Sequence, residues 1–155
     1  VRMRGELRKL QEELGISFVH VTHGQDEALA LADEIVVMNN AVIEQAGPAR
    51  DVFNAPKTRF VAQFMGGHNV IALANGNFAI RTDAVRVSPP KASVMEADII
   101  SVEYQGTHVT ILTRVAGDQE VKALVRDADF FAQPHAPGDR IGLSWDPQDL
   151  HQLTA

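Results

Sequence analysis

The stretch that decides the fold is residues 18–28, Phe-Val-His-Val-Thr-His-Gly-Gln-Asp-Glu-Ala. The β-branched apolar run Ile16–Val21 predicts a short strand, which delivers His23 to the point where a helix begins. Ligands of open parallel sheets bind beyond the carboxyl ends of the strands, and the free amides of a helix N-terminus favour anionic oxygens. The sequence therefore places His23 where it can contact a phosphate group.

The residues on either side of this stretch predict alternating helices and strands. Four apolar side chains recur at helical spacing: Met3, Leu7, Leu10 and Leu14. Gly15 ends that helix. Thr22, with Gln25 three residues later, fits a capping box for the next helix, which we expect to end near Asp33.

A hairpin and a short helix are predicted next. Ile35–Met38 has the composition of a strand, and Asn39-Asn40 tolerates the left-handed backbone of a tight turn, so that Ala41–Ala46 returns antiparallel. Pro48 suits the first position of a helix, where no amide donor is needed, and Asn54–Pro56 closes it.

A last helix precedes a change of pattern. Thr58 can cap it, and its apolar stripe is formed by Phe60, Val61 and Phe64. Gly66-Gly67 breaks the helix, and we place a domain boundary there. The expected division is residues 1–67 and residues 68–155.

The second part has the periodicity of short strands separated by turn residues. The predicted strands are 69–74, 78–81, 84–87, 98–104, 108–115, 120–126 and 140–145. Such a pattern favours a small β-barrel or sandwich. Val109, Ile111 and Thr113 should share one face, and Trp145 should plug the barrel or lie at an interface.

Composition excludes several classes of function. The chain has 155 residues, a formal net charge of -6, no cysteine and no apolar run long enough to span a bilayer. We therefore expect a cytoplasmic protein without disulfides. Because Lys and Arg are scattered among carboxylates, nucleic-acid binding is not expected.

Metal and serine chemistry are also disfavoured. His20 and His23 lack the i, i+4 spacing of a helical zinc pair, so no metal site is expected. The serines lack a nucleophile-elbow pattern. Core packing, not the stacking of bases, is the favoured role of five phenylalanines: Phe53, Phe60, Phe64, Phe130 and Phe131.

Val21-Thr22-His23, followed by Gln25, Glu27 and Ala28, resembles the C-terminal end of the nucleotide-binding domain of an importer-class ABC transporter. The resemblance extends over residues 7–15, 29–39 and 47–66. From Asn69 onward, residues 81–87 and Trp145-Asp146-Pro147 resemble the TOBE extension of those importers. The implied fold is α+β in two parts: a remnant of an α/β P-loop ATPase domain, then a small OB-like barrel.

The resemblance implies a role for His23 in the ATP-hydrolysing subunit that powers such an importer. His23 matches the switch-loop histidine, which contacts the γ-phosphate of ATP and positions the attacking water. Implied cofactors of the parent protein are ATP and Mg. Implied partners are a second copy of the subunit and the transmembrane permease, which would hold the protein at the inner face of the membrane.

Other machinery of such an ATPase is not found in these residues. There is no G-x-x-x-x-G-K-[ST] loop and no Leu-Ser-Gly-Gly signature, and Asp33-Glu34 precedes its strand instead of ending one. We therefore expect this chain to be the tail of a longer ATPase and to be inactive alone, without a cofactor. Polyamine, iron, sulfate and sugar systems are all candidates, and Phe64–Val70 favours polyamine or iron.

Three positions depart from the family pattern. Gly24 stands where aspartate is common, Ala41 where glycine is usual, and Thr82 where proline is frequent. With Ala41 in the hairpin, Asn40 should take the positive φ angle.

Two further expectations remain open. The second part could act without catalysis, as a module that dimerises or binds a small regulatory ligand such as an oxyanion. In addition, Ile16–Val21 would lack the neighbouring strands of a parallel sheet. We therefore expect either disorder over roughly the first 30 residues or pairing with another copy of the chain.

Overall fold

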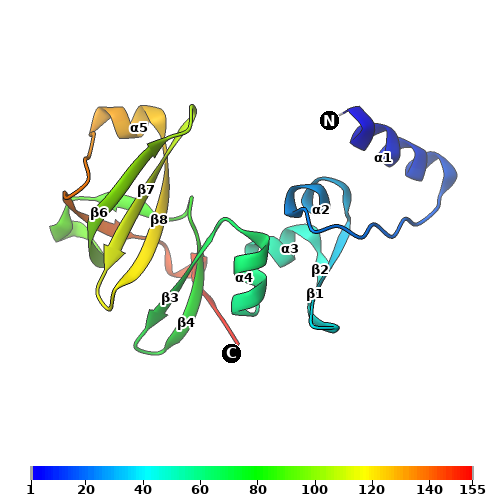
Figure 1. The fold of residues 1–155 in the computed structure, drawn as a ribbon, viewed down its shortest axis with the longest axis horizontal. Coiled ribbons are helices and arrows are strands. Elements are labelled where there is room, and N and C mark those ends of the chain that lie inside the picture. Colours follow the sequence, from blue (N-terminus) through cyan, green and yellow to red (C-terminus); the bar gives the residue numbers. More distant parts are fainter. Residues whose placement is uncertain (1, 155) are drawn as a thin grey trace.

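The computed structural model describes residues 2–154 (Figure 1). Its first part contains α1 (Arg2–Leu14), α2 (Gln25–Leu31), β1 (Glu34–Asn39), β2 (Val42–Pro48), α3 (Ala49–Asn54) and α4 (Arg59–Met65). Its second part contains β3 (His68–Leu73), β4 (Gly76–Arg81), β5 (Arg86–Ser88), β6 (Met95–Tyr104), β7 (His108–Val115), β8 (Gln119–Arg126), α5 (Asp127–Ala132), β9 (Arg140–Ser144) and β10 (His151–Gln152), with short 3-10 turns at Pro90–Ala92 and Pro147–Asp149. None of the described helices is long and apolar enough to cross a membrane.

The strand predicted at Ile16–Val21 does not form. These residues are extended but pair with no described strand, and the side chains of Val19 and Val21 are 93% and 92% exposed. A strand of a parallel sheet needs neighbours to satisfy its amides and carbonyls, and the described residues provide none here. In Figure 1 this segment runs as an open connection between α1 and α2.

The capping box predicted at Thr22 is also wrong. Gly24 is the N-cap of α2 and makes no side-chain cap bond. The Thr22 hydroxyl instead accepts a hydrogen bond from the Gly24 amide and donates one to a Glu27 carboxylate oxygen, at 2.9 and 3.0 Å. The threonine therefore stabilises the turn that carries His23 instead of capping the helix.

The predicted hairpin forms, but its turn is Asn40-Ala41 instead of Asn39-Asn40, because Asn39 belongs to β1 and β2 begins at Val42. β1 and β2 pair antiparallel, and both turn residues, Asn40 and Ala41, have positive φ angles of 47° and 63°. Asn40 tolerates that conformation more readily than alanine does. On one face of the hairpin, Ile35 and Val37 lie in an apolar core, into which α3 and α4 insert Val52, Val61 and Met65.

Two details of α3 and α4 differ from expectation. Pro48 is the N-cap of α3, one position before the predicted place, because α3 begins at Ala49. Thr58 caps α4 as predicted, accepting a hydrogen bond from the Val61 amide at 3.2 Å. The buried face of α4 is Val61, Ala62 and Met65, while Phe60 and Phe64 are half-buried and stack at its edge.

Residues 68–154, which we call the β-rich half, enclose a second core. One sheet has the order β10-β4-β3 and the other β5-β9-β6-β7-β8. All seven predicted strands are present, and Val109, Ile111 and Thr113 are buried on one face as expected. Trp145 lies in the same core, 7% exposed. The short elements α5 and β10 had not been predicted.

Side-chain amides join the two sheets where backbone pairing stops. The Asn69 amide group donates to the Lys122 carbonyl at 2.8 Å and accepts from the Lys122 amide at 2.7 Å. Gln119 bonds the amide and carbonyl of Ala72 in the same way, at 2.6 and 3.2 Å. The Asn69 bonds satisfy backbone groups on the outer edge of β8, and the Gln119 bonds satisfy those of Ala72 on the outer edge of β3.

Candidate functional site

His23 lies on an exposed bend immediately before α2. The bend is held by the Thr22 hydrogen bonds, and the Nε2 atom of His20 lies 3.7 Å from a Glu27 oxygen. Among the described residues, none makes a hydrogen bond or ion pair with His23 itself. Its imidazole is therefore available to a ligand. It is the one phosphate-binding group that we predict on this bend.

A joint at residues 66–68 connects this region with the β-rich half. Gly66 and Gly67 have φ angles of +65° and +68°, which L side chains rarely adopt. A Cβ added to Gly66 would lie 3.5 Å from the Gln25 side chain, and one added to Gly67 would lie 3.3 Å from the Phe53 ring. The helix that follows His23 therefore approaches the joint closely.

His68 is the titratable group at this joint. Its Nδ1 atom donates to the Gly66 carbonyl at 2.7 Å, its ring meets Phe53 edge to face, and its buried Nε2 atom has no hydrogen-bond partner in the described residues. Burial lowers the pKa of His68, and the nearby Arg81 and His151 charges act in the same direction. The Gly66 hydrogen bond and Asp83 oppose that shift.

Arg81 spans the two parts of the molecule. Its guanidinium lies 5.7 Å from the centre of the Phe53 ring and donates to the Asn54 side chain at 2.8 Å. It also donates to both oxygens of Asp83, and this pairing lowers the pKa of that carboxyl. A single side chain thus connects α3 with the loop that follows β4.

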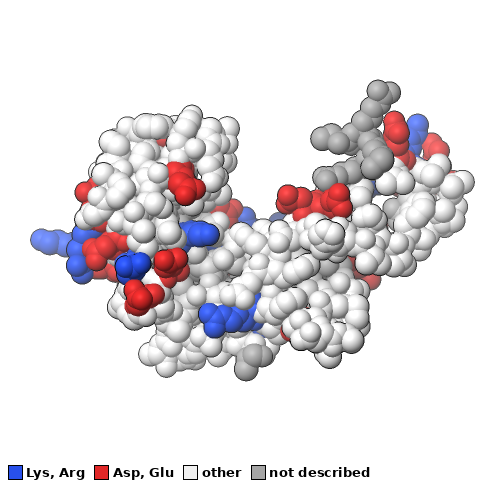
Figure 2. Space-filling model, in the orientation of Figure 1, with Lys and Arg blue, Asp and Glu red and all other residues white. Residues whose placement is uncertain are grey.

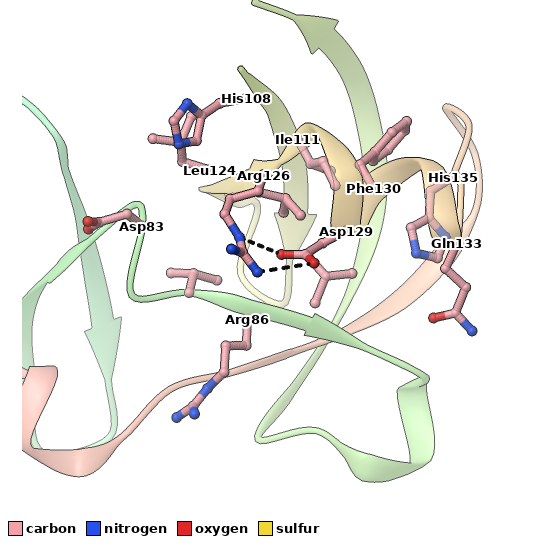
Figure 3. Close-up of a pocket in the computed structure, with 13 residues that line it drawn as sticks. Asp83, Arg86, His108, Ile111, Leu124, Arg126, Asp129, Phe130, Gln133 and His135 are labelled. Carbon is pink, nitrogen blue, oxygen red and sulfur yellow. Dashed lines mark hydrogen bonds and ion pairs between the residues drawn. The ribbon is translucent and has the colours of Figure 1, made fainter. Parts of the chain in front are cut away.

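A cleft of about 550 Å³ lies beyond that loop, between β5, β8 and α5 (Figure 3). We call it the seam cleft. Its apolar lining includes Val85, Ile111 and Phe130, which are 3%, 1% and 7% exposed. Figure 3 shows Arg126 and Asp129 pointing toward one another over its middle.

The charged groups of the seam cleft are already paired. Arg126 donates to Asp129 at 2.9 and 3.3 Å, and Arg86 extends away to Asp146 at 2.6 Å. His108 and Asp83 lie on one side of the central pair and Gln133 and His135 on the other. The sequence reveals little of this arrangement, because β5 and β8 meet only in the fold; the one local signal is the three-residue spacing of Arg126 and Asp129.

Other surface features give no further site. Among residues 2–154, no group of three or more His, Asp and Glu side chains is arranged to hold a metal ion. Figure 2 shows positive and negative side chains interspersed over the β-rich half on this face, without a broad basic area. Phe130 packs in the core as predicted, but the same prediction is wrong for Phe131, which is 60% exposed and contacts the exposed ring of Tyr104.

Comparison with known proteins matches residues 78–153 to the TOBE domain family. The spermidine/putrescine import ATP-binding protein PotA of Bacillus thuringiensis (strain Al Hakam) is 34% identical in an alignment 151 positions long, which covers 95% of this chain and 46% of that protein. The uncharacterised ABC transporter ATP-binding protein YdcT of Escherichia coli (strain K12) is 35% identical in an alignment 156 positions long, which covers 93% of this chain and 46% of that protein. The chain therefore spans less than half the length of these relatives.

A solved structure of the cytoplasmic molybdate-binding protein ModG, with molybdate bound, has a TM-score of 0.45 at 8% identity and covers 50% of this chain and 61% of that one. Similarity this slight carries no argument about a ligand. The sequence relationships are much stronger, since they extend over nearly all of the chain. Nearly all of the chain is therefore similar to ABC-type import ATP-binding proteins, and residues 78–153 match the TOBE domain family.

Proposed function

We propose that this chain is part of the ATP-hydrolysing subunit of an ABC importer, with His23 as the residue that contacts the γ-phosphate. The observation that carries the proposal is the similarity to importer ATP-binding proteins over 95% of the chain. The exposure of His23 supports it, since its imidazole has no competing partner among the described residues.

The chemistry expected of His23 is positioning. Phosphoryl transfer is catalysed mainly by placing the reactants and stabilising charge, so one imidazole at hydrogen-bond distance contributes strongly. ATP with Mg would supply the phosphoryl group. The described residues fit only this one contact, because they include no glycine-rich loop that could surround the phosphates.

The proposal includes an organisation for the whole subunit. Residues 1–67 would belong to its nucleotide-binding P-loop domain, and residues 68–155 would form a separate OB-like barrel. The subunit would pair with a second copy and bind a transmembrane permease at the inner face of the membrane. The names of several relatives favour a polyamine as the transported substrate.

The test is ATP hydrolysis by the complete gene product that contains these residues. We expect His23→Ala to lower kcat by about 100-fold or more, since removal of a positioned acid–base group has effects of that order, while ATP binding is retained. His20→Ala, three residues away, is the matched control and should hydrolyse ATP at the wild-type rate. Full activity of His23→Ala would refute the assignment, and we expect the 155-residue chain alone to hydrolyse no ATP.

A second function, ligand binding by the β-rich half, is favoured by one observation. The seam cleft has an apolar floor and a charged rim, the combination that small-molecule sites usually show. Such a site would regulate the subunit without taking part in catalysis.

A further inference from the structure

The seam cleft exists because the five-stranded sheet does not close on itself. β5 and β8 are the two outer strands of that sheet, and no backbone ladder joins them. Near its middle, β8 is attached to the other sheet by Asn69, and the Leu124 amide donates to the Thr82 carbonyl at 2.9 Å. Residues of both outer strands line the cleft, among them Arg86 of β5 and Arg126 of β8.

The edge of β8 presents backbone groups to this opening. Both backbone groups of a residue in an antiparallel strand point to the same side, and successive residues alternate. The amides of Lys122 and Leu124 bond away from β7, to Asn69 and Thr82. The Arg126 amide, two residues farther along, therefore also faces away from β7, on the side of the cleft.

The floor of the seam cleft suits an apolar group. Val85, Ile111 and Phe130 are almost completely buried and belong to the core of the β-rich half. Because these side chains hold one another in place, the floor is formed before any ligand arrives. The apolar surface still open to a ligand belongs to other lining residues, the half-buried Val87, Leu124 and Val125. Covering that surface would remove it from water.

The rim of the seam cleft favours a ligand that carries both a positive and a negative charge. The ionised residues lining the cleft are two arginines, Arg86 and Arg126, and two aspartates, Asp83 and Asp129. Each arginine already faces a carboxylate, so a bare oxyanion would meet little uncompensated positive charge. A ligand with a carboxylate and an ammonium group would instead find a complementary partner for each.

The central pair has the geometry for that recognition. Arg126 uses Nε and Nη2 to bond Asp129, and among the described residues its Nη1 has no partner. The side chains of Arg126 and Asp129 are 73% and 55% exposed, so their ion pair contributes little and opens readily. The ammonium and carboxylate groups of an α-amino acid are both bonded to its Cα atom, so its two charges lie close together, as the groups of Arg126 and Asp129 do.

We propose that the seam cleft binds an α-amino acid with an apolar side chain. Arg126 receives the carboxylate, Asp129 receives the ammonium group, and the apolar side chain lies beside Val87, Leu124 and Val125, above the buried floor. This proposal does not depend on ATP hydrolysis or on His23. It deepens the second proposed function, ligand binding by the β-rich half, and its ligand is an amino acid instead of the oxyanion suggested by the sequence.

The experiment is a titration of the isotopically labelled 155-residue chain with L-leucine, up to tens of millimolar, followed by amide NMR. We expect saturable shifts at Val87, Leu124 and Val125. Arg126→Gln and Asp129→Asn should each weaken binding about 10-fold, the effect of losing roughly 1.4 kcal/mol. Arg114→Gln is the matched control, because Arg114 makes the same kind of exposed ion pair with Asp118 outside the cleft.

Two single-charge analogues test the zwitterion directly on the wild-type chain. 4-Methylpentanoate lacks the ammonium group of leucine, and 3-methylbutylamine lacks its carboxylate, so both should bind more weakly than leucine. Absence of any shift with leucine would overturn the proposal. Sulfate or 4-methylpentanoate binding as tightly as leucine would also overturn it, in favour of an anion site.

Discussion

At the scale of single residues, the joint between the two parts depends on His68. The ring is enclosed by Phe53, Arg81 and the Gly66 carbonyl, and its Nε2 atom is buried without a partner in the described chain. Protonation would place a second positive charge beside Arg81. The folded state therefore favours the neutral imidazole, in agreement with the lowered pKa of His68.

This predicts a dependence of stability on pH. A histidine whose pKa is lower in the folded state binds fewer protons there than in the unfolded state, so the free energy of unfolding falls as pH drops below about 6.5. Chemical denaturation at pH 7.5 and at progressively lower pH should show this decrease in the free energy of unfolding. In the His68→Phe variant the decrease should be smaller.

The control for His68 is another histidine of the same chain. His23→Phe removes an exposed imidazole and should leave the pH dependence as it is in the wild type. If His68→Phe and the wild type lose stability in parallel on acidification, His68 is not the group responsible.

At the scale of elements, the packing of β9 against the turn before β6 is the tightest contact made by a glycine. A Cβ added to Gly142 would lie 2.8 Å from the Pro89 carbonyl oxygen and closer still to Ser93. β9 lies between β5 and β6 in the sheet, so a displacement there disturbs both neighbours.

We therefore expect Gly142→Ala to lower the free energy of unfolding by roughly 1–3 kcal/mol, the usual cost of overpacking. Gly5→Ala is the control, since a Cβ at Gly5 would meet nothing within 4 Å and alanine favours the helix. Denaturant unfolding of the three proteins measures both effects, and equal stability of Gly142→Ala and wild type would contradict the close approach.

The elements also show what sequence patterns can predict. Strands such as β7 were found because alternation of buried and exposed side chains is local information, and Val109, Ile111 and Thr113 follow it. Ile16–Val21 has strand composition without forming a strand, because pairing is decided by neighbours. α5 was missed because six residues give too short a periodic signal.

The two candidate sites also differ in how far the sequence predicts them. His23 could be selected from sequence because strand-like residues precede it and a helix follows, although its role remains a prediction. The seam cleft could not be selected, because Val85 and Phe130 come together only when β5 and β8 meet in the fold. No local pattern indicates the role of Arg81, because its contact with Asn54 depends on how the two parts pack.

At the scale of the whole molecule, apolar exposure is concentrated near the beginning of the chain. Val19 and Val21 are almost fully exposed on a segment without strand partners, and the outer face of the hairpin exposes Val36 and Met38 at 54% and 56%. Unpaired extended backbone beside apolar side chains promotes association.

We predict that the 155-residue chain self-associates as its concentration rises and that Val19→Lys with Val21→Lys reduces this association. Val94→Lys is the control, since Val94 is 65% exposed in the β-rich half, away from this segment. Light scattering coupled to size-exclusion chromatography measures the mass. A wild-type chain that stays monomeric at every concentration would contradict the prediction.

The residues just after β10 have a consequence for biosynthesis. The Thr154 amide donates to the Lys57 carbonyl at 2.8 Å, and Leu153 covers Ala62 of α4 and Ala79 of β4. A ribosome releases the chain from its N-terminus to its C-terminus. The contact between Leu153 and Ala62 of α4 therefore cannot form until nearly all of the β-rich half has been translated. A translational pause anywhere before Leu153 would therefore prolong the lifetime of a nascent chain with Ala62 uncovered, a species that chaperones and proteases would meet first.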